Sequence, residues 1–347
     1  MRRLWVFFWC VGAVPASAQV CGNGVLEGDE YCEVDPRGGY YFNVSGLDCR
    51  DLGFDYCTLG CVGCEMHAPD GAPLGRDTLR PMSEGYIHGY SEEERRRLVA
   101  QAELWRERFL VPGLDYRAGE KLLEIGCGVG AVLAVLGEHF PGLNLTGVDL
   151  VPSQIAAAKD ELASRGLRAD LRVADAGALP FDDASFDHVY GVWVLEHVRE
   201  PHPILREVRR VLRPGGTVAF HETDYAMFHV FPDHPDVAYL GEAQRALFRR
   251  EGDPHVARAL GARLVATGFE DVTSGPMGFH YFTGDPELAR FTDYLLGFLE
   301  PMVPRLAELG FDEARLREGV AAMRALPSLP EASITQFAFR ATARAPR

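Results

Sequence analysis

The sequence lacks an excess of positive charge. Its 35 Lys and Arg residues are outnumbered by 50 Asp and Glu residues, which gives a formal net charge of −15 at pH 7. A protein that binds nucleic acid through its phosphates needs a basic surface that releases counterions from the backbone. We therefore expect no nucleic acid among the partners of this chain, and the negative charge favours solubility.

The sequence also lacks an apolar run long enough to cross a membrane. Its N-terminal run, Leu4–Val14, is shorter than the roughly 20 residues that a spanning helix needs, and no later segment is long and apolar enough. The run follows two arginines and precedes the small residues Ala16 and Ala18, an order that is typical of a secretory signal peptide. We predict a signal peptide over residues 1–18, export to the periplasm, envelope or extracellular space, and no stable membrane span.

Cysteine is scarce outside one short segment. Of the eight cysteines, only Cys10 and Cys127 lie outside residues 19–67. The other six are Cys21, Cys32, Cys49, Cys57, Cys61 and Cys64. An even number of cysteines behind a signal peptide predicts a small disulfide-rich N-terminal module without a metal, and leaves the pairing open. Zinc held by Cys57, Cys61, Cys64 and His67 is the alternative that the spacing allows.

The first cysteines belong to a recognisable pattern. The segment begins with CGNGVLEGDEYCE, which resembles a cysteine-rich repeat of secreted surface proteins, and LDCRDLGF and CTLGCVGC are similar to later parts of that repeat. The resemblance covers about residues 21–65. It implies an extracellular or envelope location and no catalytic chemistry.

A linker and a helix follow this module. Residues 68–82 are dense in Pro, Gly and Asp, which predicts a linker. Ser91 and Glu94 then form a capping box, which predicts the start of a helix that ends at Pro112 and Gly113. The predicted apolar face consists of Leu98, Ala102, Trp105 and Phe109, which recur at helical spacing.

From Lys121 onward, short apolar runs alternate with helical stretches. The runs are KLLEI, NLTGVD, ADLRVAD, FDHVYGVW, GTVAFHE, FEDVTSG and ITQFAFRATA. This alternation predicts an α/β fold, a Rossmann-like doubly wound sheet of seven mostly parallel strands. We expect the last two strands to form an antiparallel hairpin at the edge of the sheet.

The stretch LLEIGCGVG indicates a ligand site. A strand that runs into Gly126, Gly128 and Gly130 lets a ligand approach the backbone closely at the carboxyl end of the sheet. Read through Ala131, the pattern also passes for a dinucleotide fingerprint, with Asp149 as the ribose-binding acid. A nicotinamide-dependent oxidoreductase is therefore one alternative for this domain.

Three acids at strand ends favour another ligand. Glu124 lies inside an apolar strand, where an unpaired carboxylate costs several kcal/mol, so it needs a cationic partner and would repel a pyrophosphate. Asp149 can accept hydrogen bonds from both hydroxyls of a ribose, and Asp175 can accept one from the exocyclic amine of adenine. The predicted ligand is adenosine at one end and positively charged at the other, which describes S-adenosylmethionine.

The chain resembles a class I methyltransferase of the subgroup that includes the ubiquinone-biosynthesis enzymes, methyltransferase type 11. The motifs are LLEIGCGVG, GVDLVPSQI, VADAGALPFDDASFDHVYGVWVLEHV and VLRPGGTVAF, within about residues 84–340. The resemblance implies a methyltransferase domain over 83–347, with a lid over 83–117 and an acceptor-pocket insertion over about 225–326.

The resemblance also implies roles for single residues. Glu124 would face the ammonium of the cofactor through the glycine turn, and Asp149 would hold the ribose with Leu150 against the adenine. The further implied contacts are Asp175 and Ala176 at the adenine edge, Val192 and Trp193 at the methionine end, and Tyr90 in the lid.

The reaction implied is methyl transfer by in-line displacement to a small-molecule acceptor. Aromatic residues in the insertion suit an apolar or aromatic acceptor. The candidates for a catalytic base are His197, His221, Glu222 and Asp224, which follow the fourth and fifth predicted strands. Cys127 is expected to pack inside the glycine turn without a chemical role.

Two alternatives stay open at this level. The first is an exported binding or adhesion protein whose methyltransferase-like domain does not catalyse. The second is a cytoplasmic location, since S-adenosylmethionine is made and kept in the cytoplasm. The sequence does not define the acceptor or the oligomeric state.

Overall fold

The computed structural model describes residues 32–34, 40–42 and 91–347. The chain divides into two units, Met1–Leu79 and Arg80–Arg347. In the first unit, the described residues form two antiparallel strands, β1 (Cys32–Val34) and β2 (Tyr40–Phe42). Several predicted features lie outside the described residues. They are the signal peptide, most of the cysteine-rich module, the four residues of the zinc alternative, the linker and Tyr90.

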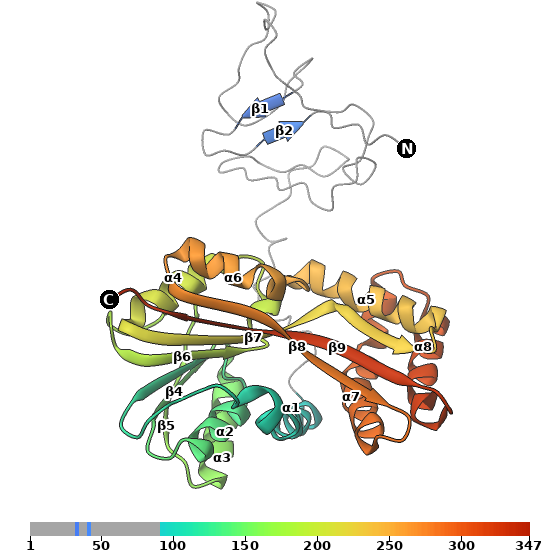
Figure 1. Ribbon diagram of the computed structural model, residues 1–347, viewed down its shortest axis with the longest axis horizontal. Helices are drawn as coiled ribbons and strands as arrows, with labels where there is room; N and C mark the ends of the chain where they lie inside the picture. Colours follow the sequence, from blue (N-terminus) through green and yellow to red (C-terminus); the bar gives the residue numbers. More distant parts are fainter. Residues whose placement is uncertain (1–31, 35–39, 43–90) are drawn as a thin grey trace, which may run out of the picture. The chain divides into compact units, whose positions relative to one another are not determined.

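The second unit contains a seven-stranded sheet (Figure 1). Its strands are β3 (Lys121–Ile125), β4 (Asn144–Asp149), β5 (Ala169–Val173), β6 (Phe186–Val192), β7 (Leu212–Phe231), β8 (Glu270–Phe282) and β9 (Ser333–Arg344), in the order β5-β4-β3-β6-β7-β9-β8. The first five strands of this order are parallel, and β9 is antiparallel to both of its neighbours. The predicted α/β fold with a mostly parallel seven-stranded sheet is confirmed.

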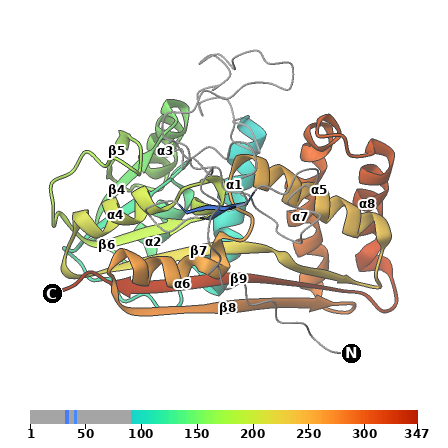
Figure 2. The same cartoon turned by 90° about the horizontal axis from the view of Figure 1, so that it is seen from above.

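The expected antiparallel pair of the last two strands at the edge of the sheet is confirmed. β8 is the edge strand and pairs with β9. β9 lies between β7 and β8, as Figure 2 shows from above. β7 has 20 residues, continues well past the predicted GTVAFHE and pairs with β9 along most of the length of β9.

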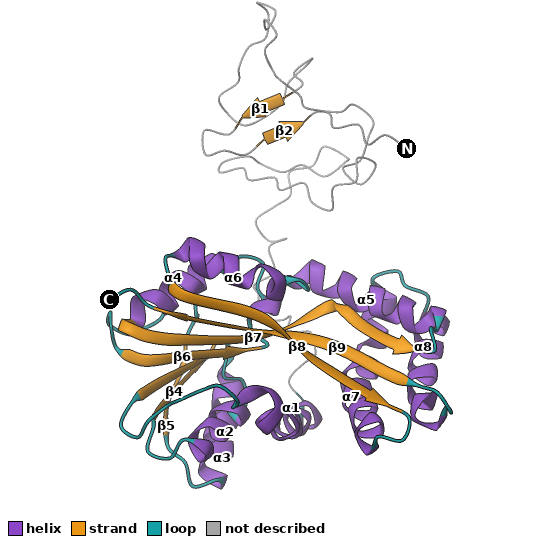
Figure 3. Ribbon diagram, viewed as in Figure 1, coloured by secondary structure: helices purple, strands orange, loops and turns teal. Residues whose placement is uncertain are grey.

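Helices cover both faces of the parallel part of the sheet (Figures 1 and 3). One face carries α4 (His202–Val211) and α6 (Val256–Thr267), and the other carries α1 (Glu92–Trp105), α2 (Ala131–His139) and α3 (Pro152–Ser164). A short 3₁₀ helix, η5 (Leu195–His197), follows β6. Each face has its own hydrophobic cluster, so the sheet separates two cores.

The remaining helices accompany the extension of β7, β8 and β9. They are α5 (Pro235–Glu251), α7 (Pro286–Glu308) and α8 (Glu313–Ala325), followed by the 3₁₀ helix η6 (Leu326–Ser328). The range 225–326 of the predicted insertion includes β8, which belongs to the sheet, and α6, which packs on it. Among the helices of the described residues, none combines the length and apolar composition that a membrane span requires.

The predicted N-terminal helix begins where its capping box places it. The hydroxyl oxygen of Ser91 accepts a hydrogen bond from the backbone N–H of Glu94 at 3.1 Å. At its C-terminal end, the helix widens into a π-helix, η4 (Arg106–Leu110), which the sequence analysis did not anticipate. We call α1 and η4 together the lid segment.

Substitution of Leu205 by Ala is expected to destabilise this unit by about 2–5 kcal/mol, because Leu205 is fully buried between α4 and the sheet and the smaller side chain leaves a cavity. Urea unfolding followed by circular dichroism measures the free energy of unfolding. The control is Arg206→Ala on the exposed face of the same helix, with an expected change within about 0.5 kcal/mol. Equal effects of the two substitutions would contradict the burial assigned to α4.

Candidate functional site

The glycine turn after β3 has a left-handed backbone at three positions. Gly126, Gly128 and Gly130 have φ angles of 63°, 50° and 73°. A Cβ atom on Gly126 would lie 2.4 Å from Cγ2 of Val194, and one on Gly130 would lie 2.9 Å from Cβ of Ala158. A Cβ atom on Gly128 would meet no atom within 4 Å. Two of these glycines therefore permit close packing, whereas Gly128 leaves open space that a ligand can use.

Glu124 is the penultimate residue of β3, which ends at Ile125 directly before this turn. Its side chain is buried, and Oε2 has no hydrogen-bond partner among the described residues. Burial, and then the nearby charge of Asp149, raise the pKa of Glu124 well above its ordinary value. An orphaned carboxylate oxygen at this place fits a ligand that brings a positive charge.

Asp149 ends β4 and fixes the glycine turn. Its Oδ2 accepts a hydrogen bond from the backbone N–H of Gly128, and its Oδ1 accepts one from the N–H of Val151, both at 2.9 Å. Each oxygen of a carboxylate can accept a further bond, so the side chain can also hold hydroxyl groups. Burial raises the pKa of Asp149 despite these amides. Leu150 follows and is 49% exposed.

Asp175 lies beyond the end of β5 in an exposed turn. Its Oδ1 accepts a hydrogen bond from the N–H of Gly177 at 2.7 Å, and Ala176 between them is half-buried. The register pairs Glu124 with Gly147 and Asp149 with Val173. The structure thus brings Glu124, Asp149 and Asp175 to the same end of the sheet, where its parallel strands have their carboxyl ends, as the sequence analysis predicted. Their roles toward a cofactor stay predictions.

Val192 and Trp193 follow at the end of β6. Val192 is buried, and Trp193 has a φ of 50°, which is uncommon for a bulky side chain. Two bonds to β7 hold this conformation: the backbone N–H of Trp193 donates to the carbonyl of His221 at 3.0 Å, and Nε1 donates to Oγ1 of Thr223 at 3.1 Å. The indole also stacks on Phe109 of the lid segment, with ring centroids 5.6 Å apart.

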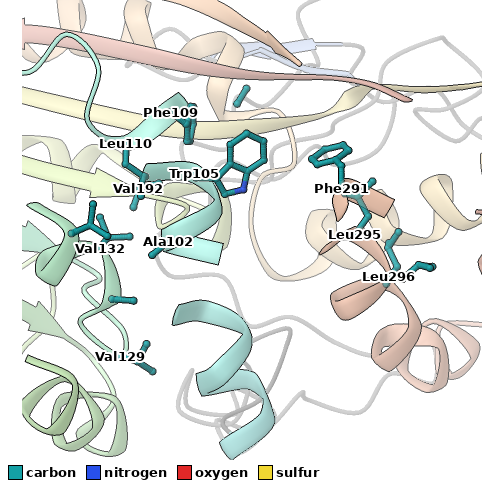
Figure 4. Close-up of a cluster of buried hydrophobic side chains, with 14 of the residues drawn as sticks. Ala102, Trp105, Phe109, Leu110, Val129, Val132, Val192, Phe291, Leu295 and Leu296 are labelled. Carbon is teal, nitrogen blue, oxygen red and sulfur yellow. The ribbon is translucent and has the colours of Figure 1, made fainter. Parts of the chain in front are cut away.

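Trp193 forms one wall of a small cavity, which we call the aromatic chamber. Its lining residues are Trp105, Phe109, Trp193, Thr223, Phe279, Tyr294, Gln336 and Ala338. The cavity has a volume of about 10 Å³, enough for one water molecule. Figure 4 shows Trp105 between Phe109 of η4 and Phe291 of α7, with Val192 close to the lid segment. The sequence analysis singled out Trp105, Phe109, Trp193 and the aromatic residues of the insertion, but it did not predict that they line one cavity.

His221 and Glu222, two of the base candidates, have structural partners. His221 is fully buried, and its Nε2 accepts a hydrogen bond from Nε of Arg340 at 2.6 Å. Burial and the Arg340 charge lower the pKa of His221 well below its ordinary value. Glu222 is also fully buried and accepts hydrogen bonds from the backbone N–H groups of residues 194, 195 and 196, at 2.9–3.3 Å. These contacts favour a structural role for Glu222. Nδ1 of His221 is buried without a hydrogen-bond partner among the described residues.

The other two candidates are similarly placed away from the chamber. Asp224 is fully buried and binds the guanidinium of Arg258 through both carboxylate oxygens. His197 lies in η5, where burial lowers its pKa to about 4, and its ring packs near Phe248. A catalytic role for any of the four candidates stays a prediction, and none of them lines the chamber.

A residue that the sequence analysis passed over is Glu196, the neighbour of His197 in LEHV. It is buried, and its Oε1 accepts a hydrogen bond from the hydroxyl of Tyr225 at 2.8 Å. Burial raises its pKa to about 7. The position of Glu196 beside His197 in the LEHV motif could have indicated a functional or structural role for it. The sequence could not show that Glu222 lies nearby in the folded chain.

A family model supports a class of protein for this domain. Residues 123–220 match the model described as a methyltransferase domain, and the matched range includes the glycine turn, Glu124, Asp149 and Asp175. The family model covers less than half of the chain.

Individual relatives agree with this class. The chain is 39% identical over 108 residues to methyltransferase GfsG of Streptomyces halstedii, covering 30% of this chain and 38% of that protein. It is 33% identical over 146 residues to a demethylmenaquinone methyltransferase of Thermus thermophilus, covering 42% and 62%. The chain thus spans less than two thirds of these curated relatives.

Among solved structures, one match is phosphoethanolamine N-methyltransferase 2 of Haemonchus contortus in complex with S-adenosylmethionine. The sequence identity is 21%, the TM-score is 0.46, and the match covers 72% of this chain and 53% of that one.

The raised pKa of Glu196 predicts a pH dependence of stability. The folded state retains this proton up to about pH 7, whereas the unfolded state releases it near the ordinary value of 4.5. The unfolding free energy contributed by this group is therefore fully present below about pH 4.5 and falls as the pH rises to about 7, by about 2–3 kcal/mol. Urea unfolding at about pH 5 and about pH 7.5 measures this loss.

Glu196→Gln should reduce the loss of stability between these two pH values, while Glu200→Gln, at an exposed position nearby, should not. Glu124 contributes in the same direction in every variant and cancels in the comparison. The charge of Glu196 also raises the pKa of Glu222, so Glu196→Gln reduces the contribution of Glu222 as well, in the same direction. A loss of the same size in the wild type and in Glu196→Gln would contradict the prediction.

Proposed function

We propose that this chain transfers a methyl group from S-adenosylmethionine to a small-molecule acceptor. The observation that carries the proposal is Oε2 of Glu124, a buried carboxylate oxygen without a partner beside the glycine turn. An S-adenosylmethionine ammonium group satisfies such an oxygen, whereas the pyrophosphate of a dinucleotide would be repelled by it. This distinction favours methyl transfer over nicotinamide chemistry on the same fold.

In this proposal, residues at the carboxyl end of the sheet bind different parts of the cofactor. Asp149 would accept hydrogen bonds from the ribose hydroxyls, Leu150 would pack against the adenine, and Asp175 with Ala176 would face its edge. Val192 and Trp193 would enclose the methionine end. When bound, S-adenosylmethionine supplies a methyl group that is already activated for displacement.

The contribution of the chain to catalysis is then mainly positioning. Holding two reactants in line lowers a barrier by up to about 7–11 kcal/mol. Trp193 is suited to this task because two hydrogen bonds to β7 and a stacked ring fix it in place. The same residue borders the aromatic chamber, so we propose the chamber as the acceptor site and an apolar or aromatic molecule as the acceptor.

We also propose that the chain is exported. The support is the signal-like N-terminus and the cysteine-rich segment that follows it. An exported enzyme needs a supply of S-adenosylmethionine outside the cytoplasm. Otherwise, the domain would have to act before the chain is exported.

Binding of S-adenosylhomocysteine tests the enzymatic proposal. Isothermal titration calorimetry on the full chain should show a dissociation constant in the low-micromolar range or below, and Asp149→Ala should weaken it at least about a hundredfold, since the ribose contacts and the anchor of the glycine turn are both lost. The matched control is Asp170→Ala, an exposed residue on β5 that pairs with Arg172. No heat with S-adenosylhomocysteine, together with measurable binding of NADH, would overturn the proposal in favour of an oxidoreductase.

Mass spectrometry of the protein from fractionated cells tests the location. We expect a mature N-terminus directly after Ala18 in the envelope or extracellular fraction, with the cysteines of residues 19–67 oxidised. An intact Met1 in the cytoplasmic fraction, with reduced cysteines, would show that the chain is not exported.

A further inference from the structure

Residues of β7, β8 and β9 form one side of the aromatic chamber, which we call its floor. They are Thr223, Phe279, Gln336 and Ala338. Side chains two residues apart on β9 point to the same face of the sheet, which places Gln336, Ala338 and Arg340 in line. The register pairs Ala338 with Thr223 of β7, and Gln336 with Phe228 of β7 and Phe279 of β8. Because the side chain of Ala338 is small, it leaves space for the cavity. Gln336 lies beside Ala338 on the same strand, between Phe228 and Phe279.

The chamber contains no charged side chain among the described residues that line it. The nearest cation along the floor is Arg340, one position further on β9, and it is already committed: Nε donates to His221 and Nη2 donates to the carbonyl of Phe109 at 2.7 Å. A charged acceptor would lose its hydration here without a counter-charge, at a cost that aromatic rings alone do not offset for an anion. The lining therefore favours an uncharged molecule.

Few polar groups line the chamber. Oγ1 of Thr223 accepts a hydrogen bond from Nε1 of Trp193. Nε1 of Trp105 is buried without a hydrogen-bond partner among the described residues, but it can only donate. The amide of Gln336 also makes no side-chain hydrogen bond to the described residues. An amide offers both a donor and an acceptor, so it can pair with a hydroxyl or a carbonyl group.

The remaining walls are flat aromatic rings. The ring centroid of Trp105 lies 4.5 Å from that of Phe279 and 5.8 Å from those of Phe109 and Tyr294. Rings arranged in this way receive another ring by stacking or edge contact. The cavity of about 10 Å³ is too small for a ring, so entry requires the roof to move. The roof residues Trp105 and Phe109 belong to the lid segment, whose η4 turn is a π-helix, a feature frequent at functional sites.

We propose that the acceptor is an uncharged planar molecule with a hydroxyl or carbonyl group, and that Gln336 is the residue that selects and orients it by hydrogen bonding to this group. This inference rests on the proposed function, because it places the acceptor next to Trp193 and hence next to the reactive end of the cofactor. According to this inference, a residue of β9 determines the specificity for the acceptor.

Three probes that share one ring system test the proposal on the full chain saturated with S-adenosylhomocysteine. They are 2-naphthol, which is neutral and carries a hydroxyl group, naphthalene, which lacks it, and 2-naphthoate, which is an anion. Calorimetric titration should give an affinity for 2-naphthol about tenfold above that for naphthalene, the size expected for one hydrogen bond, and at least about tenfold above that for 2-naphthoate.

Two variants and a control separate the roles of the floor residues. Gln336→Leu should remove the difference between 2-naphthol and naphthalene while naphthalene itself binds as before. Ala338→Leu should fill the hollow and weaken all three probes at least about tenfold. Thr335→Val, on the same strand but on the opposite face, should change none of these affinities.

The outcomes distinguish this inference from the function on which it rests. Binding of S-adenosylhomocysteine tests the proposed function alone and should be the same in all three variants. If the cofactor product binds but 2-naphthoate binds as tightly as 2-naphthol, or no probe binds, or Gln336→Leu weakens naphthalene and 2-naphthol equally, the inference is wrong while the proposed function stands.

Discussion

The site depends on one buried interaction, the hydrogen bonds that the carboxylate of Glu222 accepts from three successive backbone amides after β6. These amides begin the η5 turn, where no earlier carbonyl is available to them, so Glu222 on the neighbouring strand β7 takes the role that a capping side chain plays at the start of a helix. Burial and the nearby Glu196 raise the pKa of Glu222, because both disfavour the charged form of this side chain. The turn is thereby fixed against β7.

The fixed turn links the two halves of the site. Val194 packs against Gly126 so closely that a Cβ atom on the glycine would be only 2.4 Å away, and Trp193, one residue earlier, forms a wall of the aromatic chamber. A displacement of the turn would therefore disturb the glycine turn on one side and the chamber on the other. The left-handed φ of Trp193 persists because the hydrogen bonds to His221 and Thr223 hold it. The glycine turn and the Trp193 wall of the chamber are consequently coupled through the turn at residues 194–196.

The sequence was sufficient to predict the features that depend on local chemistry. The strand ends at Glu124 and Asp149, the glycine turn between strand and helix, and the cap at Ser91 each follow from neighbours along the chain. It was not sufficient where a partner lies far away in the sequence. The role of Asp224 depends on Arg258, and that of His221 on Arg340 of β9, contacts that arise only from strand register and helix packing. The base candidates were chosen for their position after a strand, and this position says nothing about such partners.

The buried carboxylates of this edge differ in one respect that bears on function. The oxygens of Glu222 are satisfied by backbone amides, and Glu196 accepts a bond from Tyr225, so both belong to the completed fold. Glu124 is as deeply buried, yet its Oε2 has no partner among the described residues. A buried polar atom left unpaired costs about 1–3 kcal/mol, more when it is charged. At the carboxyl end of the sheet the fold thus supplies partners for Glu196 and Glu222 but not for Oε2 of Glu124. A cationic ligand bound there would remove this cost and so stabilise the folded chain.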